Sequence, residues 1–491
     1  MPQIAAEQPA AHNKPTKHFV IKIIMKSLRR ILFALALTAC SIIVESCISD
    51  AFTTSSSDVL AFSVDTLKFD TVITAQGSPT KQFIIYNHAK KNINISSIRI
   101  AQESEGHFFL NVDGVKGDEF HNIEIMGGDS IYVFVESLLD PTGEDEPIWL
   151  KDKIFFETNG VTQQVVLTAW SQDVERLADV EITSDTHLTA NKPYVIYDSL
   201  VVSPKATLYI DEGATLLFHD KAKLKVEGRL LVNGTQKNPV NFRGDRLDHV
   251  VGKIGFDIMS GQWDGVEFMP GSIGNEIRYL LMRGTRWGMW VEAENANERT
   301  LLIHNSVLHN SSNSVFTSIN AWVEATGTEF SDGSQAVVDF YGGKVWLAQC
   351  TMANYYLFSS IDRPLVNFNV PKDNPNCLYC QLDNCIIYGN AADVDMGKLD
   401  GTQVYLRNCL LKSNGVDDAN FINCVWAGDP LFYTVREDYI FDYRLRNSSG
   451  AIAMGNRDLC PESARYDRYG NDRFVREGVD LGAYTWVPAE E

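Results

Sequence analysis

Three five-residue units that recur every eight residues decide the fold: ATLYI at Ala206–Ile210, ATLLF at Ala214–Phe218 and AKLKV at Ala222–Val226. A fourth unit, GRLLV at Gly228–Val232, follows closely. Each unit has apolar residues at alternate positions, so one face of a short strand points inward. Strands so close in sequence leave no room for crossover helices. The chain is therefore predicted to wind as a coil of short strands, with successive coils about 4.8 Å apart.

A longer repeat follows, in six hexads that share one pattern. They are IHNSVL at 303–308, ATGTEF at 325–330, LAQCTM at 347–352, LDNCII at 382–387, LRNCLL at 406–411 and FINCVW at 421–426. The first three start 22 residues apart, which we interpret as one turn of a β-helix. The third position is Asn, Gly or Gln. Because Asn and Gly tolerate a left-handed backbone, we expect the sharp bend between two strands there. We also expect the stacked Asn side chains to hydrogen-bond to one another along the ladder.

The fourth position of the hexads is Ser, Thr or Cys, a small residue that we expect to point inward. This position accounts for four cysteines as unreactive packing residues: Cys350, Cys385, Cys409 and Cys424. Seven cysteines follow the candidate lipidation sites, and an odd number does not indicate a disulfide framework. Cys377 and Cys380 form a CxxC pair without a second pair at zinc spacing. A local disulfide or two free thiols is favoured there over a metal site.

The block 59–172 is predicted to be a small β-sandwich. It contains short β-branched and aromatic runs, such as 83–86, 130–135 and 164–168, separated by Gly, Asn and Asp turns. The order of these features resembles bacterial immunoglobulin-like modules, although no Cys…Trp…Cys core is present. The resemblance implies a stalk or an interaction module near the membrane.

Residues 1–46 are interpreted as an export signal. Lys26, Arg29 and Arg30 precede the apolar run 31–39, as in a signal peptide. The apolar run is too short to span a bilayer. Met25 by itself opens a good signal peptide, so 1–24 is interpreted as an upstream extension.

Two cysteines are candidate lipidation sites. Cys40 ends a small-residue LTAC sequence but is followed by apolar residues, whereas Cys47 opens a polar tether over 47–58. This start resembles Gram-negative outer-membrane lipoproteins, which favours Cys47 and leaves Cys40 as the alternative. The resemblance implies a lipid anchor at the bacterial outer membrane or cell surface, and several acyl chains would make that anchoring stable.

The charge of the chain excludes one class of partner. Its formal net charge is −20. An acidic surface repels the phosphate backbone of DNA and RNA, so we expect no nucleic-acid partner.

Motifs near the C-terminus point to a family. They are DPLF at 429–432, YRLRNSSGAIAMGN at 443–456, YDRYGNDR at 466–473 and VDLGAY at 479–484. Together with the repeats they resemble the closing region of right-handed parallel β-helix, pectate-lyase-like proteins, with Leu481 where Ile is usual and Thr485 where Glu is common. The resemblance implies an all-β chain with a right-handed parallel β-helix of roughly ten coils over 195–430. It also implies a linker or N-terminal cap over 173–194 and a capping region over 431–491 that covers the open apolar end.

The same family includes polysaccharide lyases, pectin-degrading hydrolases and proteins without shown activity. Such lyases need a basic residue beside calcium-binding acids, and such hydrolases need two or three Asp on one face. The acidic candidates here are Asp245, Asp248 and Asp264, and the basic ones are Arg283 and Arg286. Neither catalytic motif is recognisable, so we assign no catalytic residue, no metal ligand and no cofactor, and calcium has no supporting motif. A salt-bridged corner of a coil is the favoured interpretation of Asp245.

Aromatic residues could instead bind a ligand. Trp263, Trp287 and Trp290, with Arg283, could form a platform for a saccharide, although half-buried positions on an outer sheet face are the more usual location of such rings. We therefore favour a non-enzymatic envelope lipoprotein whose β-helix binds a glycan or an envelope protein. The alternative is a polysaccharide lyase or glycoside hydrolase.

Overall fold

The computed structural model describes residue 25, residues 51–103 and residues 106–489. The predicted signal peptide and both candidate lipidation cysteines lie outside this set, apart from Met25. From residue 51 onward the described helices are six short 3-10 turns: η1 (Phe256–Ile258), η2 (Met396–Lys398), η3 (Arg436–Asp438), η4 (Arg457–Leu459), η5 (Glu462–Ala464) and η6 (Arg473–Val475). Within the described residues, no helix has the length and apolar character that a bilayer crossing requires.

The N-terminal domain is a β-sandwich. One five-stranded sheet has the order β1 (Ala61–Phe62), β3 (Lys81–Tyr86), β8 (Ser130–Leu139), β5 (Gly106–Val112), β6 (Val115–Gly117). The other has the order β2 (Thr66–Ile73), β10 (Val161–Gln172), β9 (Ile148–Thr158), β4 (Ile93–Ile100), β7 (Glu119–Ile125). The two sheets bury a shared core that includes Phe69, Phe83 and Phe156. An immunoglobulin-like relationship stays a prediction.

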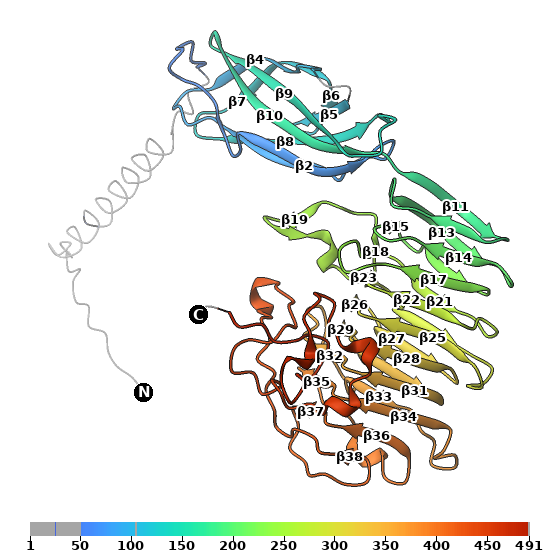
Figure 1. The fold of residues 1–491 in the computed structure, drawn as a ribbon. Helices are drawn as coiled ribbons and strands as arrows, with labels where there is room; N and C mark the ends of the chain where they lie inside the picture. Colours follow the sequence, from blue (N-terminus) through green and yellow to red (C-terminus); the bar gives the residue numbers. More distant parts are fainter. Residues whose placement is uncertain (1–24, 26–50, 104–105, 490–491) are drawn as a thin grey trace, which may run out of the picture.

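The rest of the chain is a parallel β-helix whose coils have three faces (Figure 1). Face A is the ten-stranded sheet β12 (Thr186–Leu188), β14 (Thr207–Ile210), β17 (Arg229–Asn233), β22 (Asn275–Arg278), β25 (Arg299–His304), β28 (Trp322–Thr326), β31 (Gly343–Ala348), β34 (Leu378–Asp383), β36 (Gln403–Arg407), β38 (Phe421–Ile422). Face B contains β15 (Thr215–Phe218), β18 (Val240–Gly244), β23 (Leu280–Thr285), β26 (Val307–Ser311), β29 (Glu329–Gly333), β32 (Thr351–Asn354), β35 (Ile386–Gly389), β37 (Leu410–Leu411). Face C contains β16 (Lys223–Val226), β21 (Gly265–Phe268), β24 (Met289–Glu292), β27 (Phe316–Ile319), β30 (Val338–Tyr341), β33 (Val366–Phe368).

Faces B and C join at the start of the helix through one long strand, β13 (Tyr194–Val202). Its first residues pair with β15 and its last residues pair with β16. Before it, β11 (Glu175–Ile182) pairs with β13 and β12 pairs with β14, both in parallel. The range 173–194, which we expected to be a linker or cap, therefore already contains strands of the helix. One short hairpin, β19 (His249–Val251) with β20 (Ile254–Gly255), lies between β18 and β21.

The eight-residue repeat corresponds to the three sides of one coil. Its first three units form β14 on face A, β15 on face B and β16 on face C, and the fourth forms β17 on face A. Thr207 of β14 pairs with Arg229 of β17, which closes a coil of 22 residues. Leu208, Leu216 and other alternate residues of these strands are buried in one continuous core. The predicted all-β parallel β-helix is thus confirmed, and the hand of its coil stays a prediction.

The bend between faces A and B lies at the third hexad position, as predicted. All six residues there have a positive φ: Asn305 (46°), Gly327 (59°), Gln349 (54°), Asn384 (52°), Asn408 (51°) and Asn423 (51°). The prediction that the Asn side chains bond to one another is wrong at two positions. The Asn305 amide donates to the carbonyl of Tyr466, and the Asn384 amide donates to the carbonyl of Asn456.

Both acceptors belong to the C-terminal segment, which we define as residues 429–489. We expected the overlapping range 431–491 to cover the open end of the last coil. Instead the segment runs along the side of the later coils (Figure 1). There its apolar side chains pack against outward-facing side chains of face B. Its apolar contacts include Tyr443, Leu445 and Leu481 against Ala353 and Ile386. This segment therefore forms part of the protein surface on the side of the helix.

Candidate functional site

A cleft of about 560 Å³ lies on face B, between the C-terminal segment and the turn η1. Its floor comes from three neighbouring strands, which contribute Leu281, Arg283, Val307, His309 and Glu329. The strand register places Arg283 beside His309, and Val307 beside Glu329. These residues alternate with inward side chains such as Leu308 and Phe330, so the floor consists of outward-facing positions of a regular sheet.

The walls of the cleft add aromatic and charged side chains. Asp257 and Ile258 of η1 form one wall. The other wall belongs to the C-terminal segment and includes Tyr439, Tyr469 and Arg468. The two tyrosines are 47% and 52% exposed, so their rings are available at the rim.

Glu329 is the most unusual group of the floor. Its Oε1 accepts a hydrogen bond from the Ser331 hydroxyl at 2.6 Å, and its Oε2 accepts one from the Tyr484 hydroxyl. Burial raises the pKa of this carboxyl above its ordinary value, against the opposing effect of the two hydroxyl donors. Glu329 therefore has a stronger tendency to be neutral than an exposed glutamate.

Asp332 pairs with His309 and is also fully engaged. His309 Nδ1 lies 3.1 Å from Asp332 Oδ2, and the Tyr443 hydroxyl donates to the same oxygen at 2.5 Å. The other oxygen accepts from the Tyr355 amide at 2.6 Å. Both carboxyls at this part of face B thus have hydrogen-bond partners within the chain.

A third carboxylate, Asp257, is held by arginines. Arg283 Nη1 lies 3.0 Å from Asp257 Oδ2, and Arg243 Nη1 lies 3.9 Å from it. Burial opposes the ionisation of Asp257, but the two guanidinium groups outweigh it and hold its pKa below the ordinary value. Of the residues suggested by the sequence as ligand contacts, Arg283 is the one that lines this cleft.

The acidic candidates Asp245 and Asp248 lie elsewhere, where the sandwich meets the helix. Asp245 Oδ2 accepts from Gln76 Nε2 at 3.0 Å and lies 2.7 Å from His219 Nδ1. The Arg246 guanidinium donates to both oxygens of Asp248, at 3.0 and 2.9 Å. Both aspartates line a separate cavity of about 420 Å³ between the two domains. Their contacts join the sandwich to the coils, which agrees with a structural role.

The third acidic candidate is paired as well. Arg286 Nη1 donates to Asp264 Oδ1 at 2.6 Å. Burial raises the pKa of Asp264 above its ordinary value, and Arg286 opposes this. Asp264 does not line the face B cleft, so the structure does not bring the three aspartates together there.

The predicted tryptophan platform is wrong for one of its three members. Trp263 is fully buried, stacks on Phe218 with ring centroids 3.9 Å apart, and donates from Nε1 to the carbonyl of Arg283 at 2.9 Å. Trp287 is 48% exposed, and Trp290 points outward from face C. Trp263 is a core residue because its ring fills the inside of a coil.

Three of the four hexad cysteines lie inside the coil, and Cys424 is only half-buried at its edge. Cys350, Cys385 and Cys409 are fully buried. Burial raises the pKa of the Cys385 and Cys409 thiols well above the ordinary value, so they are unreactive. Cys377 and Cys380 are free thiols. In the part of the chain that the structure describes, no three His, Cys, Asp or Glu side chains are placed to bind a metal ion.

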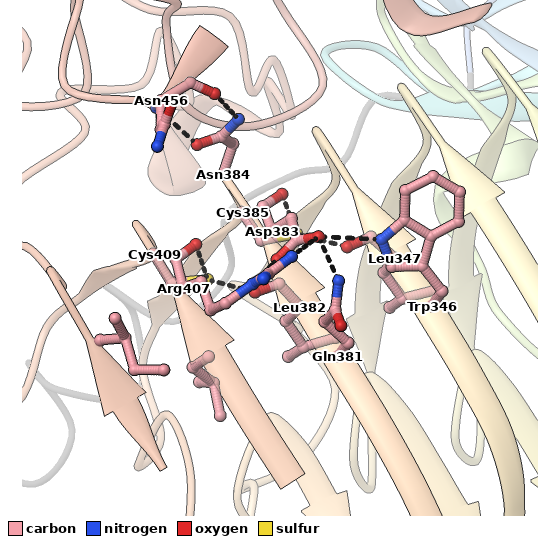
Figure 2. Close-up of polar contacts among 12 residues, drawn as sticks. Trp346, Leu347, Gln381, Leu382, Asp383, Asn384, Cys385, Arg407, Cys409 and Asn456 are labelled. Atoms are coloured by element: carbon pink, nitrogen blue, oxygen red, sulfur yellow. Dashed lines mark hydrogen bonds and ion pairs between the residues drawn. The ribbon is translucent and has the colours of Figure 1, made fainter. Parts of the chain in front are cut away.

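Another buried carboxylate, Asp383, lies on the outer side of face A (Figure 2). Trp346 Nε1 donates to its Oδ2 at 2.9 Å, and Gln381 Nε2 donates to the same oxygen at 2.7 Å. Arg407 adds two bonds, from Nε to Oδ1 at 2.7 Å and from Nη2 to Oδ2 at 2.9 Å. The four bonds tie three adjacent strands together, so this network stabilises the sheet.

Comparisons with known proteins assign no family. No family model matches the chain, and no curated protein matches it. One similar solved structure is the secreted serine protease VesC from Vibrio cholerae, with 13% identity, a TM-score of 0.17 and coverage of 23% of each chain. Another is a family 123 glycoside hydrolase from Clostridium perfringens, with 6% identity, a TM-score of 0.16 and coverage of 23% of this chain and 26% of that one. The catalytic domain of a GH87 α-1,3-glucanase in complex with nigerose has 9% identity and a TM-score of 0.13, over 71% of this chain and 87% of that one. The matches to the protease and to the family 123 enzyme span about a quarter of each of those chains, and all three TM-scores are too low to indicate a function.

Proposed function

We propose that the chain is a non-enzymatic saccharide-binding protein of the bacterial cell envelope and that the face B cleft is its binding site. The observation that supports this most is the composition of the cleft. Exposed tyrosine rings stand at its rim, charged groups line its floor, and its buried Glu329 carboxyl is already engaged within the chain. Aromatic rings offer apolar faces to sugar rings, and a few placed polar groups then orient the ligand.

The same carboxyls argue against hydrolysis. A glycosidase needs one carboxyl group as acid and a second one as base or nucleophile on either side of the scissile bond. Each oxygen of Glu329 and each oxygen of Asp332 accepts a hydrogen bond from a protein donor. A nucleophile or base in this position would first have to break those bonds.

A glycoside hydrolase is the second candidate, and one observation favours it. The raised pKa of Glu329 is the property that a general acid needs at neutral pH. Against it, the other carboxylates that line the cleft are held by arginines: Asp257 lies 3.0 Å from Arg283, and Asp442 lies 2.5 Å from Arg444.

Binding is tested by applying the purified chain to an array of immobilised saccharides. We expect retention on at least one class of saccharide, and competition by the same saccharide in solution. Retention on none of them, by a chain shown to be folded, would contradict the proposal.

The envelope location rests on lipid attachment at Cys47, which a polar tether follows. We expect Cys47→Ala to move the chain from the membrane fraction to the soluble fraction, because the acyl chains supply the membrane affinity. Cys40→Ala serves as the matched control and should stay with the membrane. The opposite pattern would assign the anchor to Cys40.

A further inference from the structure

One buried arginine of the cleft lacks the partners that its neighbours have. Arg468 is 8% exposed and lines the cleft, yet its Nε and Nη1 have no hydrogen-bond partner among the residues that the structure describes. Leaving buried donors unpaired costs free energy, and more so when they belong to a charged group. A guanidinium in this state is suited to receive an acceptor from outside the chain.

Arg473, five residues along the same segment, shows what a purely structural arginine looks like here. It is buried as well, and each of its nitrogens donates to a backbone carbonyl: Nε to Ala464, Nη1 to Gly482 and Nη2 to Ala483. The contrast shows that burial in this segment does not prevent an arginine from being fully paired. Arg468 differs in lining the cleft and in leaving two of its nitrogens unpaired within the described chain.

The carboxylates around the cleft do not neutralise Arg468. Asp257 is paired with Arg283, and the Asp442 carboxylate lies 2.5 Å from the Arg444 guanidinium. Asp467, next in sequence, accepts bonds from its own loop and from the Thr485 amide. Glu329 is shifted toward its neutral form. Among the groups that line the cleft, no carboxylate therefore neutralises the positive charge of Arg468.

We infer that Arg468 is an anion-recognition residue and that the saccharide bound in the cleft carries an acidic substituent, either a carboxylate or a sulfate ester. This inference rests on the proposed function and narrows its ligand. Guanidinium groups bind both substituents through charge-assisted hydrogen bonds. The net charge of −20 disfavours a densely charged polymer, because the rest of the surface would repel it. The ligand is therefore a largely neutral saccharide with an isolated acidic group.

The test uses three sugars with the same ring: glucose, glucuronate and glucose 6-sulfate. Their affinities for the purified chain are measured by NMR titration. We expect one or both acidic sugars to bind at least about tenfold more tightly than glucose, in line with the free energy of a charge-assisted hydrogen bond. The two acidic sugars distinguish a carboxylate site from a sulfate site. Added salt should weaken the binding of the acidic sugars more than that of glucose.

Substitutions of Arg468 test whether this residue causes the preference for acidic sugars. Arg468→Gln should reduce the affinity for the acidic sugar by about 10- to 100-fold, to the level of glucose, and leave glucose binding unchanged. Arg468→Lys should retain part of the preference, because it keeps the charge but loses the planar fork. Arg229→Gln removes the same charge from an exposed position on face A and should change nothing. Circular dichroism and thermal unfolding of each variant identify any loss of the fold.

Each outcome is decisive. Equal affinity for all three sugars, or an acidic preference that survives Arg468→Gln in a folded variant, overturns the inference and leaves the proposed function standing. No binding of any of the three sugars by a chain that retains saccharides on the array also overturns it. No binding in either assay removes the proposed function as well.

Discussion

Replacing Trp263 with alanine is expected to lower the free energy of unfolding by about 3–5 kcal/mol, the range measured when a large buried aromatic side chain is removed from a core. The ring is fully buried inside a coil, stacks on Phe218 and donates a hydrogen bond to the backbone of face B. Its removal would leave a cavity that the strands of neighbouring coils cannot fill, because each strand is fixed by pairing on both sides. Urea unfolding followed by fluorescence and circular dichroism measures the loss.

Trp287→Ala is the matched control. This ring is 48% exposed, and surface substitutions usually change stability by no more than about 0.5 kcal/mol. The two variants should therefore differ several-fold in effect although they remove the same side chain. A loss of less than about 1 kcal/mol for Trp263→Ala would contradict the packing described for this coil.

Replacing Asp383 with alanine is expected to cost about 2–4 kcal/mol, because it removes one partner of a buried ion pair and leaves several donors unpaired. Asp383 is 1% exposed and accepts from Trp346, Gln381 and Arg407. Arg407 is about 30% exposed and can turn toward water, so the cost stays below that of a fully buried pair. Equilibrium unfolding of the variant measures this loss.

Asp395→Ala is the control for the loss of a carboxylate. Asp395 pairs with Lys398 at 3.0 Å, and both side chains are exposed, so the pair contributes about 0–1 kcal/mol. If the two aspartate variants have the same stability, the network in Figure 2 does not stabilise the sheet.

The coil could be predicted from the sequence because the residue patterns that specify it lie within short stretches of the chain. Alternating apolar residues specify a strand with one buried face, and Asn or Gly at the third hexad position marks the left-handed bend. The bend is found at each of the six predicted positions, including Gln349, which has neither residue type. Here the register of the neighbouring coils imposes the backbone conformation.

The cleft could not be predicted in the same way, because its walls come from distant parts of the chain. The hydroxyl of Tyr484 reaches Glu329 across 155 positions of sequence. No periodicity indicates that the C-terminal segment packs on the side of the helix. The inward position of Trp263 was equally hidden, because this residue precedes β21 and lies outside the alternation of the strand.

One feature of the sequence does indicate the floor of the cleft. At the fifth hexad position the chain has Val307, Glu329, Thr351, Ile386, Leu410 and Val425. A glutamate in a series of otherwise apolar residues and one threonine indicates a local function or a local partner. Arg468 has no comparable signal, because its burial depends entirely on tertiary packing.

Saccharide cleavage by the purified chain is the measurement that tests the central claim most directly. The chain is incubated with pectin, alginate, glycosaminoglycans and the saccharides retained on the array, with and without calcium. New reducing ends and unsaturated products are then quantified. We predict binding without any release of such ends, because the carboxyls of the cleft are engaged within the chain. Release of product that is lost on substitution of Asp245, Asp248, Asp264 or Glu329 would contradict the account and identify the chain as an enzyme.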